Sequence, residues 1–154
     1  DMRGNPGGLL DASVDISAIW LPRDSTVLEE KRGSEVVQRY KTTAQPILAG
    51  MPTVVLIDEG SASASEIVAG ALRDNGVVTI LGQKSFGKGS VQRLINLNAG
   101  GSLKVTIARW FTPSGKSIDK EGIVPDEEVP LTPEDREADR DPQLEAALAI
   151  VQKN

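Results

Sequence analysis

Apolar residues recur at helical spacing in three parts of the chain. Residues 9–21 place apolar side chains three and four positions apart, which predicts a helix that Pro22 closes. Residues 63–75 show the same spacing, and Asn75 followed by Gly76 is a typical helix end. Residues 143–153 predict a short amphipathic helix at the C-terminal end of the sequence.

Two uninterrupted apolar runs flank the second of these helices. Residues 53–58 (TVVLID) and 77–81 (VVTIL) do not alternate, which is typical of strands buried on both faces. A strand, a helix and a strand joined by short links predict a right-handed crossover, with the two strands parallel.

Other segments predict antiparallel strands and a linker. Residues 26–32 and 35–42, separated by a Gly-Ser pair, indicate an exposed hairpin. Residues 90–97 and 102–111 indicate a second hairpin, joined through a turn at 98–101. The following Pro-rich, acidic stretch predicts a solvated linker over 130–142.

The amino-acid composition excludes several kinds of catalytic and metal-binding chemistry, whereas it says little about the fold. With 154 residues, 39% of them hydrophobic, the chain fits one domain with one core. It has no Cys, which excludes disulfides, thiol nucleophiles and thiolate metal ligands. It has no His, which excludes a Ser-His-Asp triad built from this chain. We expect no metal and no cofactor.

The charge of the chain does not favour nucleic acid. Residues 119–141 carry a net charge of −7 against −5 for the whole chain, so the remaining residues carry only +2. That excess is small for a phosphate-binding surface, and 3% aromatic residues offer little for stacking bases. We therefore expect no nucleic-acid partner.

Two glycine-containing segments could bind developing negative charge. Residues 5–8 (NPGG) precede a predicted helix and free backbone N–H groups for close approach, although a simple turn explains them as well. Residues 60–66 (GSASASE) lie between a predicted strand and helix, where Ser63 and Glu66 fit a capping box. The same turn could present the Ser63 hydroxyl as a nucleophile, with the Ala64 N–H in an oxyanion hole.

A third segment, 82–90 (GQKSFGKGS), nearly matches a phosphate-binding loop. Gly89 occupies the Ser/Thr position of that pattern, and a strand is predicted where a helix should follow, so a nucleotide site is disfavoured. Without His, a serine nucleophile needs another base, and Lys88 in this loop is a candidate, although a solvated lysine is the ordinary interpretation. A lysine base must be neutral, which burial favours; Leu81, Phe86 and Val91 could supply apolar walls.

Five segments together resemble the C-terminal processing peptidases, also called tail-specific proteases. In chain order they are 1–10 (DMRGNPGGLL), 59–67 (EGSASASEI), 82–92 (GQKSFGKGSVQ), 111–118 (FTPSGKSI) and 122–126 (GIVPD). The family is a Ser-Lys peptidase family. The resemblance implies an α/β fold, a Clp protease/crotonase-like core with a mixed β-sheet and packed helices. We expect that core over 1–129, truncated at its N-terminus, then a linker over 130–142 and a C-terminal helix over 143–154.

The resemblance also implies roles for individual residues. Ser63 would be the nucleophile and Lys88, 25 residues further on, the general base, with Gln92 orienting the lysine. The oxyanion donors would be the N–H groups of Ala64 and of Gly7 or Gly8, a choice that stays open. Asp74, about 16 Å along the helix from Ser63, is expected to be a capping or ion-pair residue with at most a supporting role.

The same resemblance implies partners and a compartment. The substrates would be proteins with unstructured C-terminal tails that end in small or apolar residues. A PDZ domain would lie upstream of Asp1, and an exposed sheet edge could support a homo-oligomer. The expected location is extracytoplasmic, in a bacterial periplasm or cell envelope. A non-catalytic, tail-binding or scaffold fragment of such a protease is the alternative.

Overall fold

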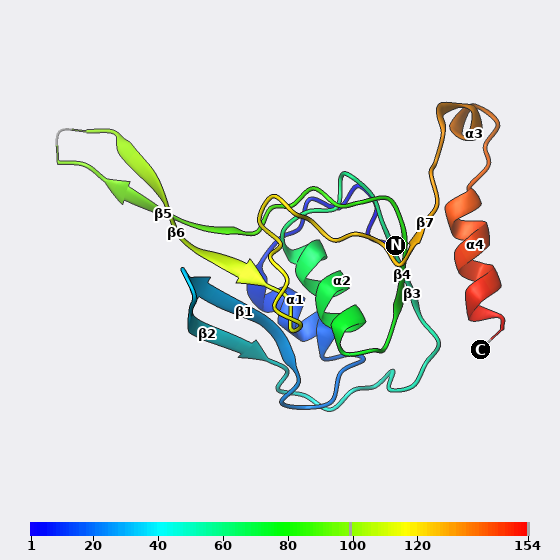
Figure 1. Cartoon of the computed structure of the whole chain (residues 1–154), viewed down its shortest axis with the longest axis horizontal. Helices are drawn as coiled ribbons and strands as arrows, with labels where there is room; N and C mark the ends of the chain where they lie inside the picture. Colours follow the sequence, from blue (N-terminus) through cyan, green and yellow to red (C-terminus); the bar gives the residue numbers. More distant parts are fainter. Residues whose placement is uncertain (99, 154) are drawn as a thin grey trace.

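The chain winds around one central helix, α2 (Ala64–Asp74), in a computed structural model that describes residues 1–98 and 100–153 (Figure 1). The remaining elements are α1 (Leu10–Ser17), β1 (Thr26–Arg32), β2 (Glu35–Lys41), β3 (Val54–Ile57), β4 (Thr79–Gly82), β5 (Ser90–Asn96), β6 (Ser102–Phe111), β7 (Glu127–Glu128), α3 (Pro133–Glu137) and α4 (Pro142–Val151). Ala99, in the predicted turn of the second hairpin, and Asn154, in the predicted C-terminal helix, lie outside the described residues. No helix of the described part is long and apolar enough to cross a membrane.

Two sheets share the strands. One is antiparallel with the order β2-β1-β6-β5, so both predicted hairpins are confirmed. The other is parallel with the order β3-β4-β7, which confirms the parallel pair on either side of α2. The α/β class is therefore confirmed, with parallel and antiparallel pairing divided between two sheets. Figure 1 shows the β5–β6 hairpin extending away from the rest of the chain.

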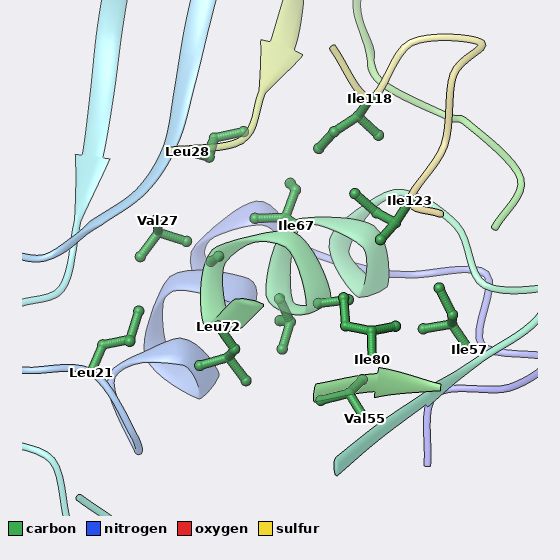
Figure 2. Packing of buried hydrophobic residues seen from close by; sticks show 13 residues of the cluster. Leu21, Val27, Leu28, Val55, Ile57, Ile67, Leu72, Ile80, Ile118 and Ile123 are labelled. Carbon is green, nitrogen blue, oxygen red and sulfur yellow. The ribbon is translucent and has the colours of Figure 1, made fainter. Parts of the chain in front are cut away.

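The core lies between α2 and its neighbours. Residues Ala64 to Leu72 of α2 are all buried, because apolar groups surround the helix on several sides. Figure 2 shows Ile67 and Leu72 of α2 among side chains from both sheets and from the later loops. The buried cluster includes Leu21, Val27, Leu28, Val55, Ile57, Ile80, Ile118 and Ile123.

The parallel sheet has a helix on each face because its strands alternate between two cores. Val55, Ile57 and Ile80 point into the cluster around α2, whereas Leu56 and Leu81 pack with Ala147 of α4. The predicted C-terminal helix is thus confirmed, and it is a docked part of the fold.

Most predicted boundaries differ from the structure by one or two residues, and three differences have a clear physical reason. α1 ends at Ser17 rather than at residue 21, because the next residues bond elsewhere: the Ile19 carbonyl accepts from Leu48 N–H at 2.9 Å. β4 begins at Thr79 because Val77 N–H donates to the last turn of α2. The predicted linker contains the short helix α3, whose cap Thr132 accepts from Asp135 N–H at 3.1 Å.

Asp74 ties the end of α2 to the turn after β6. One carboxylate oxygen accepts from Ser114 N–H at 3.0 Å and the other lies 3.3 Å from Arg73 Nε. Burial works to raise the pKa of Asp74, but hydrogen bonds from Thr112 and Ser114 and the Arg73 charge outweigh it. The pKa of Asp74 is therefore lowered from its ordinary 3.8. This confirms an ion-pairing role for Asp74.

We expect Asp74→Asn to lower the free energy of unfolding by about 1–2 kcal/mol at pH 7, because hydrogen bonds to a partly buried charge are lost. The lowered pKa means that the ionised form stabilises the fold above pH 3.8, and that this contribution disappears as pH falls through the folded-state value. Urea unfolding at neutral and acid pH should show the two proteins converging in acid. Asp15→Asn, at an exposed site of α1, is the control. A difference between Asp74→Asn and the parent that is the same at every pH would contradict the explanation.

Candidate active site

Ser63 lies on a strained turn between β3 and α2. Its backbone angles are φ 58° and ψ −117°, a left-handed conformation that side chains other than glycine rarely adopt. Ile67 N–H donates to the Ser63 carbonyl at 3.0 Å and so begins the helix immediately after the turn. The capping box predicted for the Ser63 hydroxyl and Glu66 is present, and the Glu66 carboxylate accepts from Ser63 N–H at 2.8 Å. The turn therefore presents this hydroxyl at the helix N-terminus.

The N-terminal NPGG segment packs directly on that turn. Asn5 carbonyl accepts from Ala62 N–H and from the Ser65 hydroxyl, each at 3.0 Å. Gly7 has φ 92°, and a Cβ there would lie 2.5 Å from the Ala62 carbonyl oxygen and 2.8 Å from Ser63 Cβ. Only glycine fits this close approach, so the segment is held against the Ser63 turn.

The backbone hydrogen bonds distinguish the two glycines. Gly7 N–H donates to the Asn5 side-chain oxygen at 3.0 Å. Within residues 1–98 and 100–153, neither Gly8 N–H nor Ala64 N–H has a hydrogen-bond acceptor. Gly8 and Ala64 line one cavity, and Ala64 directly follows Ser63, so these two residues carry N–H groups without an acceptor next to the Ser63 turn.

That cavity has a volume of about 200 Å³ and a mostly apolar wall. Its wall is formed by Met2, by residues of α1 and by Val68 of α2. The apolar lining residues are Met2, Leu9, Ala12, Ile16 and Val68. A cavity of this lining and size suits an apolar side chain of modest length.

A buried carboxylate joins the Ser63 turn to the loop that carries Lys88. Glu66 is fully buried. One of its oxygens accepts from Ser63 N–H at 2.8 Å and from Lys88 N–H at 2.9 Å. The other accepts from the Ser85 hydroxyl at 2.6 Å and from Gly87 N–H at 2.7 Å. The backbones of Ser63 and Lys88 therefore share one acceptor atom.

The side chains of the expected dyad are not joined in the same way. Within the described residues, no hydrogen bond connects the Ser63 hydroxyl, the Lys88 ammonium and the Gln92 side chain. Lys88 and Gln92 are both exposed. The apolar walls expected around Lys88 are not formed: Phe86 is 68% exposed, and Leu81 faces α4. The fold brings the two backbones together and leaves the lysine side chain in solvent.

Two further segments singled out in the sequence, Asp74 and the loop 82–89, have structural surroundings of their own. Asp74 lies at the opposite end of α2 from Ser63 and makes its contacts with Arg73 and Ser114. Strand β5 follows the loop 82–89, so this loop lacks the helix N-terminus on which phosphate-binding loops depend. No group of three or more acidic side chains in the described residues is arranged to hold a metal ion.

Sequence reasoning missed two residues of this site. Glu66 was interpreted only as a cap of α2, although it also holds the Lys88 loop. Ser85 is buried and bridges Glu66 to the Ile123 N–H, which donates to its hydroxyl at 2.7 Å. The acidic residue of a capping box inside an apolar helix was the one available signal for Glu66; no sequence signal marked Ser85.

Comparison with known proteins agrees with this geometry. The model of peptidase family S41 matches residues 1–129. The carboxyl-terminal-processing protease of Picosynechococcus sp. is 45% identical over 86% of this chain, which covers 32% of that protein. The chain thus spans about a third of the length of this relative.

Solved structures show the same relationship. The photosystem II D1 C-terminal processing protease superposes with a TM-score of 0.79 and 36% identity, over 84% of this chain and 33% of that one. A solved structure from Parabacteroides merdae shares the fold, with a TM-score of 0.76 at 23% identity, over 97% of this chain and 50% of that one. From the family match and these likenesses, the chain belongs to peptidase family S41.

Proposed function

We propose that this chain is the catalytic core of a serine endopeptidase that cleaves proteins near their C-terminus. One observation carries the proposal: Ser63 lies on a strained turn, and the N–H groups of the next residue, Ala64, and of Gly8, in the segment packed on that turn, have no acceptor among the described residues. Free donors that converge beside a serine hydroxyl are suited to stabilise the oxyanion of acyl transfer. Family membership and the names of the relatives support a serine-type peptidase.

In the proposed reaction, Ser63 Oγ attacks the carbonyl carbon of the scissile peptide bond while Lys88 Nζ accepts the hydroxyl proton. The carbonyl oxygen becomes an oxyanion that Ala64 N–H and Gly8 N–H stabilise. The C–N bond then breaks, the departing amine takes the proton from Lys88, and an acyl-Ser63 ester remains. Water hydrolyses the ester with Lys88 again as the base, which restores the Ser63 hydroxyl.

Lys88 must approach Ser63 for this reaction. Its flexible side chain starts from a backbone that Glu66 holds beside the Ser63 turn. A lysine acts as a base only when it is neutral, and apolar surroundings favour that form. Because Lys88 is exposed in this chain, bound substrate must supply the apolar cover, with Gln92 orienting the amine.

The proposed substrates are proteins with unstructured tails that end in small or apolar residues. The cavity beside Ser63 supports this, because its wall of Met2, Leu9, Ala12, Ile16 and Val68 excludes charged side chains on energetic grounds. Tails of matched length that differ only in the residue before the scissile bond would test it. Equal cleavage after Ala and after Asp would contradict it.

The wider setting is proposed from the relatives. They include a chloroplastic processing peptidase of Arabidopsis thaliana and cyanobacterial proteases, which supports an extracytoplasmic location for the protein. The same proposal includes a PDZ domain that selects the tail of the substrate. It also includes a homo-oligomer in which copies of the chain pair through a sheet edge. Cell fractionation and light scattering would test the location and the oligomeric state.

A second candidate is a tail-binding fragment that does not cleave. The exposed, unpaired Lys88 side chain favours it, because the dyad is not assembled in this conformation. Cleavage separates the two candidates: binding of a tail without any product would support the second.

We expect Ser63→Ala and Lys88→Ala each to lower kcat/KM on an unfolded protein with an apolar tail by at least about 10³-fold, because each removes a partner in acyl transfer. Mass spectrometry of the products would measure this for the chain and for a version extended upstream as in the longer relatives. Lys84→Ala, in the same loop and also exposed, is the control. Near-normal turnover in Lys88→Ala would exclude Lys88 as the base.

We expect Glu66→Gln to destabilise the fold and to abolish cleavage. An amide has one acceptor oxygen, so its NH₂ group would face two of the four donors that now meet the carboxylate. Each buried donor left without an acceptor costs about 1–3 kcal/mol, so we expect a loss of about 2–5 kcal/mol in urea unfolding. Glu59→Gln, an exposed site on the same turn, should change neither quantity.

A further inference from the structure

The residues after the family match dock beside the start of the chain. Residues 130–153, here called the C-terminal segment, follow β7 and contain α3 and α4. Ala146, Ala147 and Ile150 of α4 pack against Val54 and Leu56 of β3 and against Leu81 of β4. Figure 1 shows α4 next to these strands, on the side away from the β5–β6 hairpin.

Arg3 connects this segment to the residues that line the site. Its guanidinium forms a two-pronged ion pair with Asp141, from Nη1 at 2.9 Å and from Nη2 at 2.8 Å. The side chains of Arg3 and Asp141 are 15% and 33% exposed, so the pair is partly shielded from water. Paired charge-assisted bonds of this geometry fix orientation as well as position.

Gln143 adds a second contact between Arg3 and the C-terminal segment. It is fully buried; its oxygen accepts from Arg3 Nη1 at 2.9 Å and its amide nitrogen donates to the Val129 carbonyl at 2.7 Å. Within the described part of the chain, every hydrogen bond between residues 1–8 and the C-terminal segment involves the Arg3 guanidinium. Loss of Arg3 would leave the Gln143 oxygen buried without its donor.

Arg3 lies in the stretch that sets the position of Gly8. Met2 N–H donates to the Leu56 carbonyl at 2.9 Å and Gly4 N–H to Asp58 at 2.7 Å, so the backbone is fixed on both sides of Arg3. Between Arg3 and Gly8 the chain contains two glycines with positive φ, Gly4 and Gly7. Glycine restricts the backbone less than other residues do. The position of the Gly8 N–H therefore depends on anchors at both ends of this short stretch.

We propose that Arg3 and Asp141 are positioning residues, through which the C-terminal segment fixes the loop 4–8 and its oxyanion donor Gly8. This rests on the proposed function, because only a peptidase needs that donor. Neither residue touches the reacting atoms. A displacement of the donor by about 1 Å is enough to slow catalysis, and complete loss of one donor costs about 10²–10³ in kcat.

Asp141→Asn tests the proposal cleanly. Asp141 also caps α4 by accepting from Leu144 N–H at 2.9 Å, and asparagine is an equally good cap, so the helix start is retained. The change removes the charge and one of the two Asp141 oxygens that accept from Arg3, which keeps its ion pair with Asp1 at 2.7 Å and its bond to Gln143. Asp135→Asn is the matched control, because Asp135 accepts from the N–H of the α3 cap Thr132 at 3.2 Å and pairs with Arg140, entirely inside the C-terminal segment.

We expect Asp141→Asn to lower kcat about 10-fold or more with KM within about twofold, and Asp135→Asn to leave both unchanged. Arg3→Lys, which keeps the charge without the fork, should lower kcat in the same way. Combined with Asp141→Asn it should cost less than the sum of the two single losses, because both changes break the Arg3–Asp141 contact. An unchanged kcat in Asp141→Asn, or losses that add fully in the double variant, would overturn the proposal.

Amide hydrogen exchange gives a readout that does not depend on activity. Gly4 N–H and Gly7 N–H, both hydrogen-bonded here, should exchange faster in Asp141→Asn than in the parent and in Asp135→Asn. Equal exchange in all three proteins would overturn the proposal. A parent chain that cleaves nothing would count against the proposed function, while the exchange rates would still decide whether the Arg3–Asp141 contact orders the loop.

Discussion

The arrangement of this site depends on one buried carboxylate, that of Glu66. A buried carboxylate without partners would be strongly unfavourable, and here four donors surround it instead. Two of these donors, the backbone N–H groups of Ser63 and Lys88, come from segments more than twenty residues apart. The requirement to satisfy the carboxylate therefore keeps the Ser63 turn and the Lys88 loop together, whatever the side chains of those two residues do.

Close backbone approach is the second constraint on the site. Gly7 lies against the Ser63 turn, and a Cβ at Gly89 would collide with the backbone of Asp119. Glycine at these positions lets the NPGG segment approach the Ser63 turn and lets the Lys88 loop approach Asp119, where larger residues would hold the segments apart. The positive φ of Ser63 is tolerated inside the same arrangement, because hydrogen bonds from both sides determine the turn.

The two helices on the parallel sheet have different consequences for the site. α2 supplies the Ser63 turn at its N-terminus and most of the core along its length. α4 packs on the opposite face, and its start contacts Arg3 next to the NPGG segment. Each face of β3 and β4 is thus connected to the region around Ser63, which makes this region sensitive to packing on both sides of the sheet.

The sequence by itself determined most elements and the family resemblance. Periodicity predicted α2, the parallel β3–β4 pair and both hairpins, since local side-chain spacing reports which face is buried. Its errors had two causes: residues 19 and 20, predicted as helix, instead bond to the distant residues 48 and 53, and acidic composition concealed the capped helix α3. The absence of His and Cys directed attention to Ser63 and Lys88.

Only the tertiary structure decided how those residues are arranged. The hydrogen bond from Gly7 N–H to Asn5, which Gly8 N–H lacks, and the exposure of Lys88 both depend on how distant segments pack together. The bridging role of Glu66 and the Arg3–Asp141 contact join residues that are distant along the chain. Spacing in a single sequence carries no information about which distant donor meets which acceptor, because that depends on the packing of all the elements between them.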